Sequence, residues 1–310
     1  MAETRSTEAE ALRVSAGDMT FAALAWGPPD GPLALCLHGY PDTARTWRHL
    51  GPYLAERGWR VVAPYTRGYA PTDLAPDGIY QVGALARDGA RLHGALGGDE
   101  RAVLIGHDWG AVTAYTLGAH SPQLFRRIVT MAVAPGPVVL SPFRSPSRFV
   151  RDLPLIGRQL RMSWYMAFQL LPGVSERALG RVIPRLWADW SPGYDARDDL
   201  ADVFAALDGR DRATAALRYY RAFFLPWMRR REYAAEQSRV LDLPPVALLY
   251  LHGERDGCQL AAIGRRAADL LPPGSRFELV SGAGHFLHLE RPAEVNRLIA
   301  AFIGDDRATP

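Results

Sequence analysis

The stretch LIGHDWGAVTAY, residues 104–115, sets Asp108 at the centre of a Gly-x-x-x-Gly pentapeptide. An apolar run precedes the pentapeptide and a helix-like stretch follows it, a pattern that predicts a strand, a tight turn and a helix. Aspartate is a good helix N-cap and glycine is a common turn residue, so these five residues alone require no chemistry. The rest of the sequence has to decide whether the carboxylate is a functional group.

Short apolar runs recur on both sides of this stretch, and segments of helical period separate most of them. The runs cover residues 33–37, 60–63, 102–105, 128–133, 246–251 and 276–280. Strands that alternate with helices form parallel βαβ units. The sequence therefore predicts an α/β fold with a mostly parallel central sheet and flanking helices, whose ligands bind at the carboxyl ends of the strands.

Residues 135–238 break this alternation, because they show helical periods without convincing strands and are rich in arginine, tryptophan, tyrosine and phenylalanine. The segment is too long for a loop. We predict a helical cap, inserted after the sixth strand between a first core part, residues 1–134, and a second core part, residues 239–310. Its aromatic residues favour a lid over an apolar pocket, although core packing would account for most of them.

The composition narrows the possible chemistry. The sequence contains no lysine, which excludes a Schiff-base lysine and the lysine of a phosphate-binding loop. Cys36 and Cys258 lie far apart and belong neither to a metal-ligand spacing nor to a redox pair. We therefore expect no cofactor and no metal.

The charge and hydropathy patterns narrow the possible partners and the compartment. The formal net charge is only +3, and the one conspicuous basic run, residues 229–231, is typical of a solvated helix face. The N-terminus lacks the basic start and apolar middle of a secretion signal, and no apolar run approaches the roughly 18 residues that span a bilayer. We expect a cytoplasmic protein, a monomer or a homodimer, with neither nucleic acid nor a membrane as a partner.

Three side chains capable of catalysis follow predicted strands. Asp108, Asp256 and His285 come after the third, fifth and sixth of the apolar runs. Each lies where a parallel sheet presents its catalytic loops. The order nucleophile, acid, histidine is that of the α/β-hydrolase arrangement, so the three residues together are far more specific than any one of them.

A fourth motif, His38-Gly39-Tyr40-Pro41, follows the first of the apolar runs. A turn at this place would aim the backbone amide of Tyr40 at the predicted site. Together with the backbone amide of Trp109, it would form an oxyanion hole.

Over nearly its whole length the chain resembles the α/β-hydrolase superfamily, and within it the epoxide hydrolase branch. The motifs that carry the resemblance are His-Gly-x-Pro at 38–41, Arg-Gly-Tyr at 67–69, the Gly-His-Asp-Trp-Gly pentapeptide, Asp256 and Gly284-His285. The segments SWYMAFQLLPGV and LRYYRAFF are similar to the two cap segments in which that family carries its epoxide-activating tyrosines. The resemblance implies that these tyrosines are Tyr165 and Tyr220. The asparagine usual in the second segment is missing here, and Tyr219 is an alternative to Tyr220.

The resemblance also implies a reaction in two steps. An aspartate side chain is ionised near neutral pH, so Asp108 can attack an epoxide carbon without a base and form an ester. Protonated tyrosines would meet the departing oxygen. His285, oriented by Asp256, would then activate the water that hydrolyses the ester. The substrate would be a small apolar or aromatic epoxide, bound by side chains of Trp109, Tyr40, Trp164 and Phe168.

Three other functions compete with this one. A haloalkane dehalogenase shares the aspartate and Trp109, but it typically offers asparagine or glutamate after the His-Gly, where Tyr40 stands here. A fluoroacetate dehalogenase would need arginines beside the nucleophile, and residues 111–115 supply none. A non-catalytic ligand receptor on the same fold would not need the nucleophile, the base, the acid and both cap tyrosines together.

Overall fold

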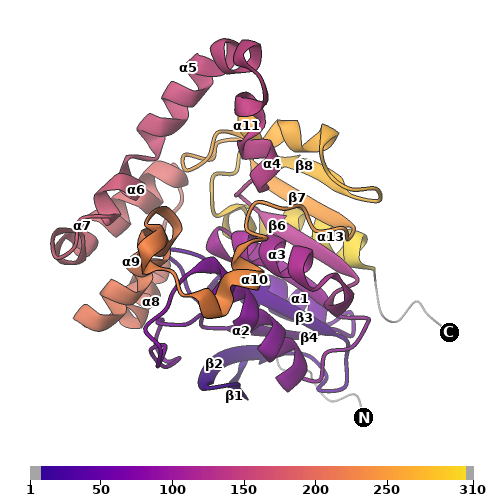
Figure 1. The fold of residues 1–310 in the computed structure, drawn as a ribbon. Coiled ribbons are helices and arrows are strands. Elements are labelled where there is room, and N and C mark those ends of the chain that lie inside the picture. The colour runs from indigo at the N-terminus through magenta and orange to yellow at the C-terminus, as the bar shows by residue number, and fades with distance from the viewer. Residues whose placement is uncertain (1–7, 305–310) are drawn as a thin grey trace.

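A computed structural model describes residues 8–304 of the chain, which form an eight-stranded sheet with helices on both faces (Figure 1). The strand order is β1-β2-β4-β3-β5-β6-β7-β8. The first two strands form a hairpin, β2 pairs antiparallel with β4, and every pairing from β4 to β8 is parallel. The strands are β1 Glu10–Ala16, β2 Met19–Trp26, β3 Leu33–Leu37, β4 Arg60–Pro64, β5 Val103–His107, β6 Arg127–Met131, β7 Leu248–Gly253 and β8 Arg276–Val280.

The mostly parallel α/β architecture predicted from the sequence is confirmed, and the six apolar runs correspond to β3 to β8. The hairpin of β1 and β2 was not predicted. Its second strand, MTFAALAW, is rich in alanine and buried at nearly every position. Alanine is depleted in strands, and a strand buried on both faces shows no alternation of polar and apolar residues, so the pattern carries little strand signal.

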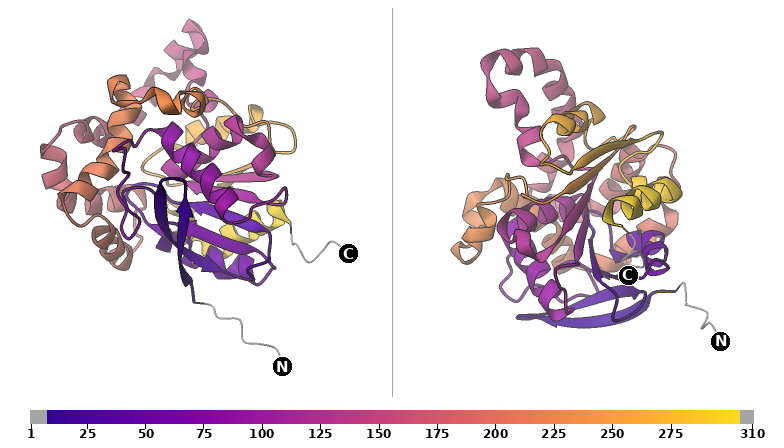
Figure 2. Two further views of the ribbon diagram at one scale, coloured as in Figure 1. Left: turned by 60° about the horizontal axis from the view of Figure 1, so that its bottom comes forward. Right: turned by 90° about the vertical axis from the view of Figure 1, so that its right-hand side faces the viewer.

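The central strands pack a core on each face of the sheet. In β3, Leu33, Leu35 and Leu37 belong to the core on one face, whereas Ala34 and Cys36 belong to the core on the other. This alternation follows from the two-residue period of a strand. Figures 1 and 2 show one layer with α2 Val82–Ala95, α3 Trp109–His120 and α10 Ala234–Gln237, and an opposite layer with α1 Leu50–Ala55 and α13 Pro292–Ile303.

The chain between β6 and β7 contains helices and no strand, as expected for a cap that follows the sixth strand. Its main helices are α4 Gly136–Val139, α5 Pro146–Met162, α6 Trp164–Gln169, α7 Val174–Trp190, α8 Arg197–Ala206 and α9 Arg210–Phe224. Helices α6 to α9 lie together beside the sheet, and α5 projects from the body of the molecule (Figures 1 and 2). The division into parts at residues 134/135 and 238/239 stays a prediction, and residues 1–7 and 305–310 of those parts lie outside the described chain.

Residues 8–304 contain no helix with the length and hydropathy that a bilayer-spanning segment requires.

A buried ion pair attaches the loop that follows β4 to helix α2. The guanidinium of Arg67, 2% exposed, donates from Nε and Nη2 to the two oxygens of Asp88, both at 2.6 Å. Its Nη1 donates to the carbonyl oxygen of Ile79 at 2.6 Å. Each nitrogen of the guanidinium therefore donates a hydrogen bond, and Nε and Nη2 bind Asp88 in a fork geometry that lysine could not reproduce.

Arg67→Met is expected to lower the free energy of unfolding by about 3–5 kcal/mol, because it leaves the carboxylate of Asp88 buried without a partner. Urea denaturation followed by circular dichroism measures this loss. Arg197→Met is the matched control, because Arg197 pairs with Asp195 at an exposed site and an exposed pair contributes about 0–1 kcal/mol. Equal effects of the two substitutions would contradict the role given to the Arg67 pair.

Candidate active site

Asp108 lies in a strained turn between β5 and α3, with a φ of 54° and a ψ of −117°. A positive φ is unfavourable for a residue with a side chain, so the turn must be held by its surroundings. The flanking glycines allow the close approach of backbone that holds it. A Cβ at Gly106 would collide with the carbonyl oxygen of Gly110, and a Cβ at Gly110 would collide with the carbonyl oxygen of Leu37. The pentapeptide therefore has the geometry of a nucleophile elbow rather than that of an ordinary capped helix.

The three residues predicted at strand ends come together. His285 Nε2 lies 3.7 Å from Asp108 Oδ2, and His285 Nδ1 lies 3.1 Å from Asp256 Oδ2. The other oxygen of Asp256 accepts from the backbone amides of Cys258, at 2.7 Å, and Gln259, at 3.0 Å. The carboxylate of Asp256 is thus fixed before it orients the imidazole.

Two opposing effects set the protonation of His285. Burial alone would lower its pKa, but the charge of Asp256 and the carboxylate of Asp108, 3.7 Å from Nε2, raise the pKa well above the usual range for histidine. The imidazole of His285 therefore carries a proton in the free site.

Backbone amides flank the carboxylate of Asp108. The amide of Tyr40 donates to Asp108 Oδ1 at 2.8 Å. The preceding residue, Gly39, packs so closely that a Cβ there would collide with the side chain of Asp108 and lie 2.6 Å from the amide nitrogen of Trp109. The predicted pair of amides therefore lies on the two sides of Gly39, beside the carboxylate.

Tyr165 from α6 and Tyr220 from α9 bring two buried hydroxyl groups to the site, each side chain 1% exposed. Their rings meet edge to face at 5.9 Å, and Tyr220 also packs on Trp109 at 5.0 Å and on Tyr40 at 5.3 Å. Burial raises the pKa of both tyrosines well above the usual range, and the charge of Asp108 adds to the effect. Both hydroxyl groups therefore keep their protons and can donate.

The geometry separates Tyr220 from its neighbour Tyr219. The hydroxyl of Tyr219 donates to the carbonyl oxygen of Arg67 at 2.8 Å and lies 3.3 Å from Thr66 Oγ1. The hydroxyl of Tyr220 has no hydrogen-bond partner among residues 8–304. Of the two, Tyr220 is the one whose proton is free for a ligand.

The predicted substrate-binding residues differ in placement. Trp109 and Tyr40 pack on Tyr220, whereas Trp164 and Phe168 are half-buried and their rings contact one another at 6.1 Å. The described chain shows no ring contact between these two cap residues and the tyrosine pair. Phe223, not predicted, does reach Trp109, with ring centroids 5.5 Å apart.

Two further residues of the site were not predicted from the sequence. The thiol of Cys258 lies 3.3 Å from the hydroxyl of Tyr165, and burial raises the pKa of this thiol, so it stays protonated. The carbonyl oxygen of Trp190 accepts a hydrogen bond from the backbone amide of His285 at 3.0 Å. The indole ring of Trp190 packs on the rings of His285 and Tyr165, with centroids 4.9 Å away in each case. Both residues reach the site through contacts between distant parts of the chain, so no local sequence motif predicts them.

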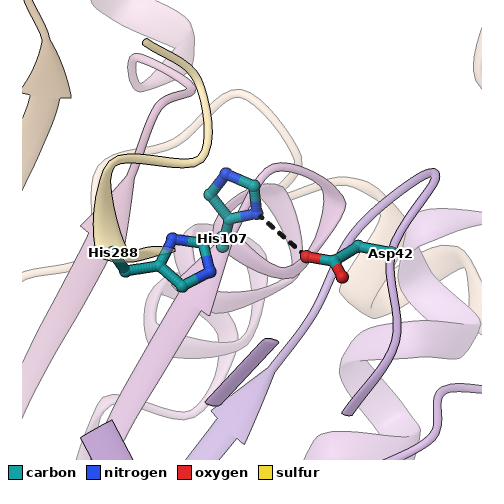
Figure 3. Close-up of side chains that lie close together, drawn as sticks. All are labelled: Asp42, His107 and His288. Carbon is teal, nitrogen blue, oxygen red and sulfur yellow. Dashed lines mark ion pairs between the residues drawn. The ribbon is translucent and has the colours of Figure 1, made fainter. Parts of the chain in front are cut away.

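Behind the elbow, Asp42, His107 and His288 form a fully buried cluster in which His107 turns one ring nitrogen toward the carboxylate of Asp42 (Figure 3). Their ligand-type atoms lie within 4.8 Å of one another, a donor set of the kind that transition metals bind. His107 Nε2 already bonds to the carbonyl oxygen of His285 at 3.0 Å, and His288 Nε2 bonds to Thr46 Oγ1 at 2.5 Å. The cluster thereby supports the loop that carries His285.

Comparisons with known proteins agree with this geometry. A model of the alpha/beta hydrolase fold family matches residues 32–292. The chain is 29% identical to epoxide hydrolase A of Mycobacterium tuberculosis, over 89% of this chain and 92% of that protein. It is 30% identical to epoxide hydrolase 3 of Siraitia grosvenorii, over 88% of this chain and 92% of that protein.

The fold is also shared with a dehalogenase. The structure of a haloalkane dehalogenase DbeA loop variant from Bradyrhizobium elkanii superposes with a TM-score of 0.75 at 22% identity, over 96% of each chain. At this identity the likeness concerns the fold alone. By its sequence and its fold, the chain belongs to the alpha/beta hydrolase family, in the branch of the epoxide hydrolases.

Proposed function

We propose that the chain is an epoxide hydrolase, which opens a small apolar or aromatic epoxide to a vicinal diol through an ester on Asp108. The observation that carries the proposal is the pair of buried, protonated tyrosines, Tyr165 and Tyr220, in the same site as the elbow carboxylate. An epoxide oxygen is a poor leaving group as an alkoxide and needs a hydrogen-bond donor when the ring opens.

In the first step, Asp108 attacks a carbon of the epoxide and the C–O bond breaks. One tyrosine hydroxyl gives its proton to the developing alkoxide, and the other donates a hydrogen bond to it. The ester removes the negative charge of Asp108 and with it one of the contacts that keep His285 protonated. The imidazolium can then give up its proton, which restores the tyrosine hydroxyl, and the neutral imidazole serves as the base of the second step.

In the second step, His285 takes a proton from water, and the resulting hydroxide attacks the ester carbonyl of Asp108. The amides of Tyr40 and Trp109 would stabilise the charge on the carbonyl oxygen, a contribution of roughly 3–4 kcal/mol per donor in comparable sites. The hydrogen bond from the Tyr40 amide to Asp108 supports this role. Collapse of the tetrahedral intermediate releases the diol and restores the carboxylate.

A dehalogenase is the second candidate, and one observation favours it. The indole N–H of Trp109 has no hydrogen-bond partner among the described residues and could donate to a halide. A halide leaves without protonation, however, so this function would give the two tyrosine hydroxyl groups no task.

Parallel assays with styrene oxide, a long-chain haloalkane and a nitrophenyl ester distinguish the candidates. The proposal expects the diol as the main product, formed at least roughly 10²-fold faster than halide release, which is the lower limit of general acid assistance. Faster release of halide would make the protein a dehalogenase. No turnover of any of the three would favour the receptor. A cytoplasmic location and a monomeric or homodimeric state stay predictions from the sequence.

The pH dependence of ester hydrolysis tests the pairing of His285 with Asp256. In the parent, hydrolysis is expected to slow as the pH falls through the pKa of His285, because a protonated imidazole cannot accept a proton from water. Asp256→Asn removes the charge that raises this pKa, so the acid limb of the profile should move to lower pH. The plateau should fall by roughly 10²–10⁴-fold, since the ring loses the partner that orients it.

Rapid-quench measurements of ester decay across the pH range give the position of the acid limb and the rate on the plateau. An acid limb at the same pH in Asp256→Asn and in the parent would show that Asp256 does not set the protonation of His285.

A further inference from the structure

Helix α5 has two different faces, and only one of them packs against other parts of residues 8–304. The inward face is fixed by polar bonds to the loop after β7: Asp152 accepts from Arg266 Nη1 at 2.8 Å, and Gln159 donates to the carbonyl oxygen of Cys258 at 2.8 Å. Leu155 and Met162 pack on the same side. The positions 152, 155, 159 and 162 repeat at helical spacing, as expected for one buried stripe.

The outward face carries a second apolar stripe that nothing in the described chain covers. Phe149, Leu153 and Leu160 are 38%, 47% and 67% exposed, and Val150 beside them is 64% exposed. The stripe continues into the preceding turn, where Phe143 is 59% exposed and packs on Phe149 with ring centroids 5.7 Å apart. Figures 1 and 2 show this helix projecting from the molecule, with its outer side away from the sheet. Clustered exposed apolar side chains of this size mark an interaction surface.

The charges of the segment that carries the stripe restrict the kind of partner that can cover the stripe. Residues 139–162 contain five arginines, Arg144, Arg148, Arg151, Arg158 and Arg161. Their only acidic residue is Asp152, which is buried and bonded to Arg266 and to Arg151. The segment is therefore strongly cationic as well as apolar.

A second copy of the helix fits these charges poorly. A pair of copies joined along the stripe would bring two strongly cationic segments together, and neither segment has a free acidic residue to balance the charge. An anionic lipid surface meets both requirements, because acyl chains receive the apolar side chains while the phosphates attract the cationic segment.

We propose that the outward face of α5, with the turn before it, binds the surface of bilayers that contain anionic phospholipids. The helix would lie in the plane of the interface, with Phe149, Leu153 and Leu160 in the boundary between headgroups and acyl chains. This departs from the expectation, drawn from the sequence, that the protein has no membrane partner.

The same contact would place the catalytic site beside a reservoir of apolar compounds. Helix α5 leads directly into α6, which carries Tyr165, and its inward Gln159 bonds to the loop that holds Asp256. This link to substrate supply rests on the proposed function, whereas the binding of α5 to lipid does not.

Vesicle flotation tests the binding without reference to catalysis. The full-length protein is mixed with vesicles of phosphatidylcholine alone or of equal parts phosphatidylcholine and phosphatidylglycerol. We expect co-flotation with the mixed vesicles, little with phosphatidylcholine alone, and a decrease as salt is added.

Two triple variants separate the apolar and the charged contributions. F149S/L153S/L160S should lower the partition coefficient by more than about tenfold, because it removes the inserted side chains. R148Q/R158Q/R161Q should lower it by roughly fivefold for each arginine at low salt. The matched control R13Q/R276Q/R297Q makes the same charge change at exposed positions outside α5 and should stay within about twofold of the parent.

Circular dichroism and thermal melting must match the parent in each variant, so that lost binding reports the surface and not unfolding. The proposal is overturned if the parent does not float with the mixed vesicles, or if the α5 variants float as the parent does. It is also overturned if light scattering shows a dimer that F149S/L153S/L160S dissociates, because a second copy then covers the stripe.

Discussion

His285→Gln is expected to stop the reaction at a covalent intermediate and to lower the turnover number by roughly 10⁴-fold or more. In the proposed mechanism the imidazole of His285 takes a proton from water, whereas the attack by Asp108 needs no base. The variant should therefore still be alkylated by an epoxide that the parent hydrolyses. Intact-mass spectrometry should show a single adduct equal to the mass of the substrate.

His120→Gln is the control for this experiment, because His120 is exposed at the end of α3. It should turn over like the parent and accumulate no adduct. If His285→Gln stays unmodified in the presence of substrate, His285 acts before or during ring opening, and the assignment of His285 to ester hydrolysis alone is wrong.

Replacing both cap tyrosines is expected to affect the other half-reaction. Tyr165→Phe and Tyr220→Phe should each slow the alkylation of Asp108 by an epoxide, within the roughly 10²- to 10⁴-fold range of general acid assistance, and the double variant should be nearly inactive. Substrate binding should change little, because the phenyl rings keep the edge-to-face packing at the site. Rapid-quench measurement of ester formation isolates this step.

Tyr219→Phe is the matched control, since the hydroxyl of Tyr219 is bonded to the carbonyl oxygen of Arg67. It should cost about 1 kcal/mol of stability and leave the rate of alkylation unchanged. If the double variant opens epoxides at the parent rate, the tyrosines are packing residues and the dehalogenase becomes the better assignment.

The sequence predicts the parts of the fold in which local pattern and burial agree. The six apolar runs correspond to β3 to β8 because each strand is short, continuous and separated from the next by a helical segment. The β1–β2 hairpin was missed because β2 is rich in alanine and buried on both faces, which leaves no clear two-residue period.

The sequence predicts those residues of the site that directly follow a strand. Asp108, Asp256 and His285 follow strands whose carboxyl ends share one edge of the sheet, so their meeting follows from topology. The choice between Tyr219 and Tyr220 does not, because neighbours on a helix point about 100° apart and only the packing of α9 decides which one faces Asp108. The thiol of Cys258 reaches Tyr165 through a contact between the cap and the loop after β7.

The outward face of α5 is another feature that the sequence alone could not predict. In the sequence, its apolar residues have the spacing of any amphipathic helix, and the segment was predicted only as part of the helical cap. The structure instead turns Asp152 and Gln159 inward and leaves Leu153 and Leu160 exposed. A hydrophobic period predicts that a face will be covered but does not tell what covers it.

Isotope transfer to Asp108 tests the central claim, that catalysis proceeds through an ester on this residue. The enzyme is allowed many turnovers of epoxide in water enriched in oxygen-18, then digested, and the peptide that contains Asp108 is weighed by mass spectrometry. Because water attacks the ester carbonyl, heavy oxygen is predicted to accumulate in the carboxylate of Asp108, and the peptide mass should rise accordingly. If the diol carries the heavy oxygen from the first turnover while the Asp108 peptide keeps its natural mass, water attacks the epoxide directly and the ester does not form.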